Sequence, residues 1–401
     1  MNNNNPQKYK NTEIGSIPED WEVKSMGEVC IKITDGTHDT PKQVESGIPF
    51  LTAIHVKPNN IDYENCYYLP EGVHRIIYNR CNPEKNDVLM VNIGAGVATT
   101  ALINIDYEFS IKNVALLKPD NSKLKGAFLN YWQIKSKSRI INSISTGGAQ
   151  PFLSLTQIGK LKIPIPTLTE QTAIATALSD ADTLINSLEK LIEKKRNIKQ
   201  GTMQKLLQPQ EGWEVKKLGE VCNVNMGQSP LSEYYNKKSI GMPLIQGNAD
   251  IENRKTIIRT YTSMITKRGK KDDIIMSVRA PVGEIAKATF DCCLGRGVCA
   301  ISYKNEYIYH YLINIENTWS NISSGSTFDS VTSKQVNDLN IYIPKSELKQ
   351  IEIATILSDM DLELGALSGK LAKLRAMKLG MMQELLTGRI RLIVTTQLVA
   401  L

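Results

Sequence analysis

The residue types that carry out enzymatic chemistry occur in this chain without the spacing that such chemistry needs. The four histidines form no H-E-x-x-H motif or other metal-ligand pair, and the seven cysteines include no C-x-x-C pair. The chain has no G-x-x-x-x-G-K-[ST] loop for nucleotide phosphates, and both Gly94-Ala-Gly96 and Gly295-Arg-Gly297 lack the third glycine of a dinucleotide fingerprint. We therefore expect a binding protein with no catalytic residues, no metal and no cofactor of its own.

The bulk composition fits an intracellular protein with packed cores. The chain has 401 residues, of which 41% are hydrophobic, enough for two to four domains. Its formal charge of +7 permits a polyanionic partner without requiring one. The N-terminus has no apolar signal region, and no apolar run approaches the roughly 20 residues that span a bilayer. The sequence thus predicts a cytoplasmic protein with reduced thiols.

Two segments of the chain occur twice. Trp21-Glu-Val-Lys-Ser-Met-Gly-Glu-Val-Cys30 returns as Trp213-Glu-Val-Lys-Lys-Leu-Gly-Glu-Val-Cys222. Ile174-Ala-Thr-Ala-Leu-Ser-Asp-Ala-Asp182 returns as Ile353-Ala-Thr-Ile-Leu-Ser-Asp-Met-Asp361. The stretches between these matched motifs show little similarity to each other. Repeated motifs that flank two dissimilar stretches indicate one scaffold that carries two different binding domains.

Each copy of the second motif opens a long helical pattern. Apolar residues recur in alternating steps of four and three, which is the pattern of a coiled-coil seam. A helix of about 39 residues would run roughly 58 Å at 1.5 Å per residue. The second copy is interrupted only by Lys378. The predicted seam consists of Ile174, Leu178, Ile185, Leu188 and Ile192 in the first helix and of Ile353, Leu357, Leu364, Leu367, Leu371 and Leu374 in the second.

Neither helix can bury such a stripe alone, so the two helices are expected to bury each other's. Antiparallel pairing would give the chain an internal pseudo-twofold. The alternative is that each helix packs only on its own globular domain; the sustained four-three repeat favours a seam between helices.

The stretches before the helices mix strands and helices. Short apolar runs at 88–93 and 114–117 predict buried strands, and 128–144 has helical spacing. Leu161-Lys-Ile-Pro-Ile-Pro166 and Leu339-Asn-Ile-Tyr-Ile-Pro344 read as strands that prolines end. We therefore predict the α+β class, with two tandem domains of mixed sheet and helices, each followed by a long helix.

The predicted boundaries follow from these patterns. They are an N-terminal arm at 1–20 that is loosely ordered up to Ile14, a first domain at 21–168, a first helix at 169–208, a second domain at 209–346, a second helix at 347–391 and a tail at 392–401.

Over nearly its whole length the chain resembles the specificity subunit of type I restriction-modification enzymes. The resemblance rests on the order of weak motifs around the two helices. They include Thr12-Glu-Ile-Gly-Ser-Ile-Pro-Glu-Asp-Trp21, Asp35-Gly-Thr-His-Asp-Thr-Pro41, Gly227-Gln-Ser-Pro230, Ile245-Gln-Gly-Asn-Ala-Asp250 and Arg279-Ala-Pro-Val-Gly283, together with both copies of the helix motif.

The resemblance implies a division of labour. Each globular domain, a target-recognition domain, would bind one half of a split, asymmetric sequence in double-stranded DNA, and the helices would set the spacing between the halves. Two methyltransferase subunits would dock on the helical region, and motor-nuclease subunits would join them. S-adenosylmethionine, ATP and magnesium would belong to those partners. The apolar tail 393–401 departs from the expected pattern.

Polar residues at the loop motifs are the candidates for DNA contact, because base recognition needs side chains that hydrogen-bond to base edges. Arg279 and Arg296 could reach guanine, and Gln or Asn side chains could reach adenine. The DNA-binding candidates are Thr37, His38, Lys57, Asn92 and Thr99 in the first domain and Gln228, Tyr234, Tyr235, Gln246, Asn248, Arg279 and Arg296 in the second.

Plainer roles compete with these assignments. Asp35-Gly36 and Gly227 would also suit turns, and Arg279 could pair with a buried carboxylate. Core or phosphate roles are favoured for Tyr234-Tyr235 and Tyr67-Tyr68 over stacking on an extruded base. The basic run Glu189–Lys205 could be a solvated helix face or could lie beside spacer DNA or a partner subunit.

Two other functions remain open on the sequence. A coiled-coil adaptor would join two protein-binding domains and would show no sequence-selective DNA binding. A DNA-modifying enzyme with cryptic motifs would act alone when given a methyl donor or magnesium.

Overall fold

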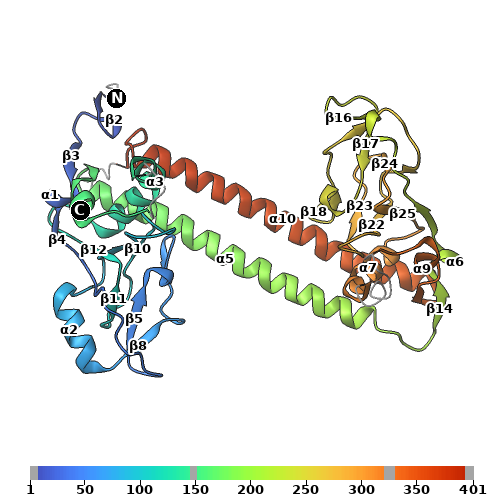
Figure 1. Cartoon of the computed structure of the whole chain (residues 1–401), viewed down its shortest axis with the longest axis horizontal. Helices are drawn as coiled ribbons and strands as arrows, with labels where there is room; N and C mark the ends of the chain where they lie inside the picture. The colour runs from blue at the N-terminus through green and yellow to red at the C-terminus, as the bar shows by residue number, and fades with distance from the viewer. Residues whose placement is uncertain (1–7, 145–150, 320–329, 393–401) are drawn as a thin grey trace, which may run out of the picture. The chain divides into compact units, whose positions relative to one another are not determined.

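The computed structural model describes residues 8–144, 151–319 and 330–392, which fold as two compact units (Figure 1). Unit 1 comprises residues 1–188 and 370–401, and unit 2 comprises residues 189–369. The two long helices are α5 (Leu168–Leu206) and α10 (Glu347–Leu385). Each unit therefore contains one globular domain and a part of both helices.

Unit 1 is built on two sheets. The antiparallel sheet has the order β10-β9-β12-β4, and the second sheet has the order β11-β5-β8 with β11 parallel to β5. The strands of these sheets are β4 (Cys30–Asp35), β5 (Ile48–Thr52), β8 (Tyr67–Leu69), β9 (Val88–Met90), β10 (Thr100–Leu102), β11 (Ser110–Lys112) and β12 (Ala115–Pro119). The paired short strands are β1 (Tyr9–Thr12) with β2 (Gly15–Pro18), β3 (Glu22–Ser25) with β13 (Lys162–Ile165), and β6 (Val56–Lys57) with β7 (Asn60–Ile61). The helices are α1 (Met26–Val29), η1 (Ala53–His55), α2 (Glu71–Cys81), α3 (Gly126–Ile144) and α4 (Leu155–Lys160).

The central strands of unit 1 are apolar on both faces because both faces are covered. Val88 and Met90 of β9 point into the core that contains α3 and the helix pair. Leu89, between them, packs in a second core with Leu51 of β5 and Ile111 of β11. The period of two thus divides the continuous apolar runs between two cores. The predicted strand at 114–117 and the predicted helix at 128–144 are confirmed, whereas the strand predicted at 88–93 is confirmed only for Val88–Met90.

Unit 2 repeats this plan with different strand lengths. Its two larger sheets have the orders β15-β25-β22-β23-β19-β18 and β16-β20-β17-β24-β21, and β14 pairs with β26. The strands are β14 (Trp213–Lys217), β15 (Asn223–Met226), β16 (Tyr235–Asn236), β17 (Met242–Ile245), β18 (Ile251–Glu252), β19 (Lys255–Thr256), β20 (Tyr261–Thr262), β21 (Arg268–Gly269), β22 (Ile274–Ser277), β23 (Ile285–Lys287), β24 (Cys292–Leu294), β25 (Val298–Ser302) and β26 (Asn340–Pro344). The helices are α6 (Leu218–Val221), η2 (Ser232–Tyr234), η3 (Asn248–Asp250), α7 (Tyr307–Asn314), η4 (Glu316–Thr318) and α9 (Ser333–Asn337).

The long helices pair antiparallel within each unit, which confirms the predicted α+β fold with a helix–helix seam. In unit 1, Ile174 and Leu178 of α5 share a core with Met382 and Leu385 of α10. In unit 2, the early part of α10 packs in the same way with the late part of α5. These ends also pack on the adjacent globular domain, so the alternative packing holds in addition to the seam. Among the other predicted seam residues, Ile185, Leu188, Ile192, Ile353 and Leu357 are buried, whereas Leu364, Leu367, Leu371 and Leu374 are half-buried.

Lys378, which interrupts the apolar stripe, has a specific partner across the seam. Its Nζ donates to Oδ1 of Asp182 on α5. The other carboxylate oxygen of Asp182 accepts hydrogen bonds from the Tyr131 hydroxyl at 2.8 Å and from Nδ2 of Asn59 at 2.9 Å. Asp182 therefore joins both long helices to α3 and to the β6–β7 turn. Unit 2 contains the equivalent pair, Lys199 with Asp361.

Removing either partner should destabilise unit 1. Asp182→Ala and Lys378→Met should each lower the free energy of unfolding by about 1–3 kcal/mol, because each change leaves a partly buried charge unpaired. Because the two side chains contact each other, the double variant should cost less than the sum of the single variants. Urea denaturation of the four proteins measures this coupling. Strict additivity would show that the ion pair contributes nothing.

A buried histidine occupies the matching place in unit 2. His310 of α7 is 1% exposed; its Nε2 lies 2.9 Å from the Ser358 hydroxyl, and its Nδ1 lies 4.0 Å from Asp361. Burial lowers the pKa of His310 to about 4, against the opposing effect of the Asp361 carboxylate. The ring is therefore neutral in the folded protein at neutral pH.

This low pKa predicts a loss of stability in mild acid. Below about pH 6.5 the unfolded chain takes up a proton on His310 that the folded chain accepts only near pH 4. The free energy of unfolding should therefore fall by about 3 kcal/mol from this group between pH 7 and pH 4. Urea denaturation across that range should show a shallower decline for His310→Gln. An identical decline in both proteins would contradict the prediction.

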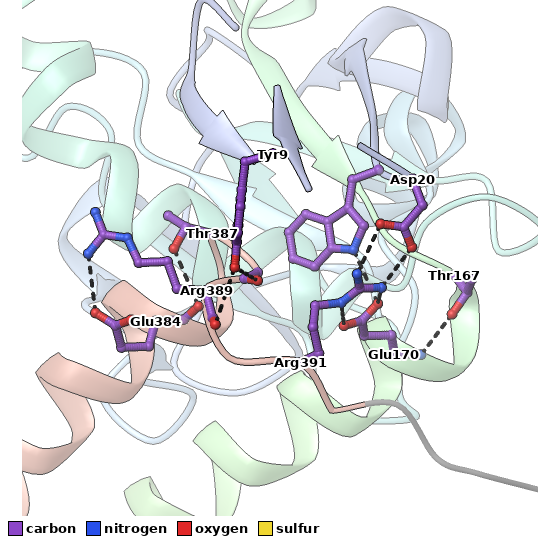
Figure 2. Close-up of polar contacts among 10 residues, drawn as sticks. Tyr9, Asp20, Thr167, Glu170, Glu384, Thr387, Arg389 and Arg391 are labelled. Atoms are coloured by element: carbon purple, nitrogen blue, oxygen red, sulfur yellow. Dashed lines mark hydrogen bonds and ion pairs between the residues drawn. The ribbon is translucent and has the colours of Figure 1, made fainter. Parts of the chain in front are cut away.

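Two described segments that are far apart in the sequence, residues 9–21 and 384–391, meet in unit 1 (Figure 2). The Arg391 guanidinium donates to both carboxylate oxygens of Glu170 at 2.6 and 2.8 Å and to both of Asp20 at 2.9 Å. Its Cζ lies 5.5 Å from the ring centroid of Trp21, whose Nε1 donates to Glu170 at 3.2 Å. Residues 9–18 form the β1–β2 hairpin, and the Tyr9 hydroxyl donates to the Gly388 carbonyl at 3.3 Å. The expectation of a loosely ordered start up to Ile14 is therefore wrong from Tyr9 onward, because the hairpin packs on the end of α10.

Two further observations concern the described residues alone. None of their helices is long and apolar enough to cross a membrane. The unusual apolar tail, 393–401, lies outside the described residues.

Candidate nucleic-acid interface

In unit 2 the loops that carry the predicted DNA-binding residues meet at the ends of four strands. The backbone N–H of Gln228 donates to the Leu294 carbonyl at 2.9 Å, and the backbone N–H of Arg296 donates to the Ser229 hydroxyl at 3.0 Å. The Gly295 amide donates to the Ile245 carbonyl at 2.7 Å. The loops that follow β15, β17 and β24 are thereby joined, and a bond from Val278 to Gly297 adds the loop after β22.

Glycines allow these loops to approach so closely. A Cβ atom on Gly227 would lie 2.1 Å from the Gly295 carbonyl oxygen, and one on Gly297 would lie 2.1 Å from the Gln246 carbonyl oxygen. Neither position can therefore accept a side chain without moving the backbone. The Gly295-Arg-Gly297 motif consequently serves loop packing and presents Arg296 between two tightly packed residues.

Most of the predicted residues of unit 2 are accessible on or beside these loops. Gln228, Gln246, Arg279 and Arg296 are exposed, and Asn248 is half-buried in η3. Arg279 forms no ion pair with a described carboxylate, so the described residues give no support to its alternative role as partner of a buried acid. These side chains thus lie together on loops that pack against one another, and their contact with DNA stays a prediction.

The two neighbouring tyrosines differ in exposure. Tyr234 is 38% exposed on η2. Tyr235 is half-buried in β16, and its hydroxyl donates to the Pro230 carbonyl at 3.0 Å. The second tyrosine therefore supports the loop that carries Gln228, and only the first presents a large accessible surface.

Unit 1 has the same loop geometry with different side chains. The Thr37 amide donates to the Ile111 carbonyl at 3.0 Å, as Gln228 does to Leu294 in unit 2. A Cβ atom on Gly36 would lie 1.8 Å from the Ile111 carbonyl oxygen, which parallels the crowding at Gly227. Thr37 is half-buried here. The same backbone position thus presents threonine in one unit and glutamine in the other.

His38 is exposed beside Thr37 and is held by two contacts. Its Nδ1 lies 2.9 Å from the Asn113 side-chain oxygen, and its Nε2 lies 3.0 Å from the Asp35 carboxylate. Asp35 also accepts a hydrogen bond from Arg80 at 2.8 Å. The position of the ring is therefore set by the loop, while one face stays accessible to a ligand.

The other predicted residues of unit 1 divide by burial. Lys57 is exposed at the β6–β7 turn. Asn92 and Thr99 are only 4% and 6% exposed, because the loop between β9 and β10 folds back through paired bonds of Val91 with Ala98 and Thr99. Thr99 accepts a hydrogen bond from Lys137 at 2.7 Å. Contact of Asn92 or Thr99 with DNA would thus require this loop to open, a constraint that no sequence pattern indicated.

Part of the basic run on α5 forms ion pairs with α10 in unit 2. Lys195 pairs with Glu363 of α10 at 2.7 Å, and Lys199 pairs with Asp361. Lys190, Lys194, Arg196 and Lys205 are exposed. Two of the six cations therefore stabilise the helix pair, and the other four face solvent.

Comparison with known proteins places this architecture in one family. The model of the type I restriction modification DNA specificity domain matches twice, at residues 18–200 and 210–376. The chain is 31% identical over 420 aligned residues to the putative type I restriction enzyme MjaX specificity subunit of Methanocaldococcus jannaschii, covering 96% of this chain and 97% of that one. The MjaVIII specificity subunit of the same organism is 25% identical over about half of each chain.

Solved structures show the same fold. The S subunit of a type I restriction-modification system from M. genitalium matches with a TM-score of 0.65 at 17% identity, covering 96% of this chain and 98% of that one. A chain from a structure of type I restriction-modification complex assembly matches with a TM-score of 0.57 at 20% identity, covering 93% and 99%. At these identities the likeness concerns the fold alone.

Proposed function

The chain belongs to the family of type I restriction-modification DNA specificity subunits, and on that premise we propose that it selects a split DNA sequence, with one half bound by each unit. The observation that carries the proposal is the repeated loop geometry with unlike side chains. Thr37 and Gln228 occupy matching backbone positions, each fixed by a bond to a neighbouring strand. One scaffold that presents two sets of polar side chains suits the recognition of two different half-sites.

The proposal assigns the chemistry to partner subunits. Two methyltransferase subunits would dock on the helix pair, and motor-nuclease subunits would complete a restricting complex. S-adenosylmethionine, ATP and magnesium would be bound by those partners, and this chain would contribute no catalytic residue. A chromosomal DNA target makes the cytoplasm the expected location.

Mapping methylated adenines tests the proposed function. The chain would be co-expressed with its candidate methyltransferase subunit, and modified adenines in host DNA would be located. The expected result is a split, asymmetric motif that disappears when this chain is omitted. An intact complex that methylates nothing, or methylates without sequence preference, would overturn the proposal and favour a protein adaptor.

Exchange of one domain sharpens the experiment. Replacement of residues 21–168 by the corresponding segment of another family member should change one half of the motif and leave the other unchanged. Changes in both halves would show that the units do not recognise DNA independently.

A further inference from the structure

The loop that carries Gln228 is fixed to a second segment of unit 2. The Thr266 hydroxyl donates to the Gln228 carbonyl, and the Ser263 amide donates to the Tyr234 carbonyl at 3.2 Å. Directly beyond the second bond, β16 pairs antiparallel with β20, Tyr235 with Thr262 and Asn236 with Tyr261. Residues 228–236 and 261–266 therefore run antiparallel beside each other. With the residues that directly follow them, the segments 228–238 and 261–268 form one surface, which we call the 228/264 surface.

Large apolar side chains are exposed on this surface. Leu231 is 62% exposed, Met264 42% and Ile265 37%. An isolated exposed apolar residue needs no explanation, but several on two paired segments beside a predicted binding loop indicate a contact site. No sequence pattern indicated them, because all three lie outside the loop motifs.

The charge on these two segments favours a polyanion as the occupant. Lys237, Lys238, Lys267 and Arg268 are exposed on the same two segments, against the single carboxylate of Glu233. Four cations on the segments that carry the apolar residues suit phosphate contacts beside base contacts. Among polyanions, double-stranded DNA offers an apolar group at a base edge in its major groove, which is the C5-methyl group of thymine.

From this arrangement we propose that the 228/264 surface recognises an A·T base pair in the major groove. Gln228 hydrogen-bonds to adenine N6 and N7, and one of Leu231, Met264 and Ile265 packs on the methyl group of a thymine. The inference rests on the proposed function and adds to it a base identity and the side chains that select it. The hydrogen bond that the Gln228 backbone donates to Leu294, and those that Thr266 and Ser263 donate to this loop, hold these groups in place before DNA binds.

Replacement of thymine by uracil tests the proposal, since it removes only the methyl group. The complex of this chain with its methyltransferase subunit would be titrated with duplexes that carry the mapped target. Each thymine in the half-site bound by unit 2 would be replaced in turn. At one position uracil should raise Kd about fourfold, the ratio expected for one buried methyl group.

Alanine variants then identify the side chain responsible. Of Leu231→Ala, Met264→Ala and Ile265→Ala, at least one should bind thymine and uracil duplexes about equally. Val215→Ala, which removes an apolar side chain 54% exposed on β14, should keep the fourfold ratio. This control has comparable exposure on a different sheet of unit 2.

The outcomes separate this inference from the proposed function. If sequence-specific methylation is present but no uracil substitution in that half-site changes Kd, the inference is overturned and the proposed function stands. The same conclusion follows if that half-site contains no A·T pair, or if every alanine variant keeps the fourfold ratio. If the alanine variants impair subunit assembly and no uracil substitution changes Kd, the surface would be assigned to a protein partner instead. Absence of any sequence-specific methylation would remove the premise itself.

Discussion

Replacing Arg391 with methionine should lower the free energy of unfolding of unit 1 by about 3–5 kcal/mol. The Glu170 side chain is only 3% exposed and accepts two hydrogen bonds from the Arg391 guanidinium. Without these two bonds the buried Glu170 carboxylate would still accept the hydrogen bond from the Trp21 indole, but it would have no cation beside it among the described side chains (Figure 2). Urea denaturation followed by tryptophan fluorescence measures the change, because Trp21 lies in the contact itself.

Arg389 provides a matched control two residues away. Its side chain is 64% exposed, and its pair with Glu384 is near the surface. Arg389→Met should therefore cost at most about 1 kcal/mol. Arg391→Lys should fall between the two, because one ammonium group cannot satisfy two carboxylates in a bidentate manner. Equal stability of Arg391→Met and Arg389→Met would contradict the importance of this contact.

Acid should weaken the same contact. The hydrogen bond from Arg391 lowers the pKa of Asp20 below its ordinary value near 3.8. A carboxylate with a lowered folded-state pKa stabilises the fold above that ordinary value, and the contribution is lost as pH falls through the folded-state pKa. The difference in stability between wild type and Arg391→Met should therefore shrink below about pH 4.

The repeats made the long helices predictable, and they could also have predicted the ion pairs between the helices. Alternating steps of four and three were enough to place both helices and to predict their pairing. Lys378 looked like an interruption, but it lies 179 residues after Lys199, the same offset that separates Asp361 from Asp182. A lysine and an aspartate repeated at one offset could have indicated the two ion pairs across the seam.

The contact between the chain ends could not be found in this way. Position 212, which lies 179 residues before Arg391, is a glycine. In unit 2, α5 continues through the chain into β14, whereas in unit 1 the end of α10 and Trp21 are far apart in sequence. The ion pairs of Arg391 therefore hold the end of α10 beside Trp21, whereas at Gly212 the chain itself joins α5 to the equivalent segment. A contact between residues more than 350 positions apart with no repeat leaves no local pattern.

Burial decided which candidate site residues are accessible, and it depends on loop packing. The motifs placed Gln228, Gln246 and Arg296 on loops, and the structure shows those loops in contact. Asn92 and Thr99 had similar local sequence surroundings, yet bonds within their loop bury them. The strands of two residues, such as β16 and β20, were equally hard to foresee, because so few residues show no clear alternation.

DNA affinity of the assembled complex should fall steeply with salt. If the complex contacts six to ten phosphates, raising the salt from 50 to 200 mM should weaken binding by about 10³–10⁵. The physical cause is the release of counterions from DNA, which becomes less favourable as bulk salt rises. Titration of a labelled target duplex at four salt concentrations gives the slope of log K against log salt. An affinity that does not change with salt would contradict DNA recognition.

Single substitutions should separate phosphate contacts from base contacts in the same titration. Lys57→Met should weaken binding to all duplexes alike and reduce the salt slope by about one, as loss of one phosphate contact does. Arg279→Met should also cost about 1–3 kcal/mol for the cognate duplex, but it should relax selection at one base pair. Lys24→Met removes a half-buried lysine that pairs with Glu22 on β3, away from the predicted loops, and should leave both quantities unchanged. If Lys57→Met weakened binding only for duplexes with one particular base pair, Lys57 would contact a base edge. If Arg279→Met weakened binding to all duplexes alike, Arg279 would contact a phosphate, because only base-edge contacts carry sequence information.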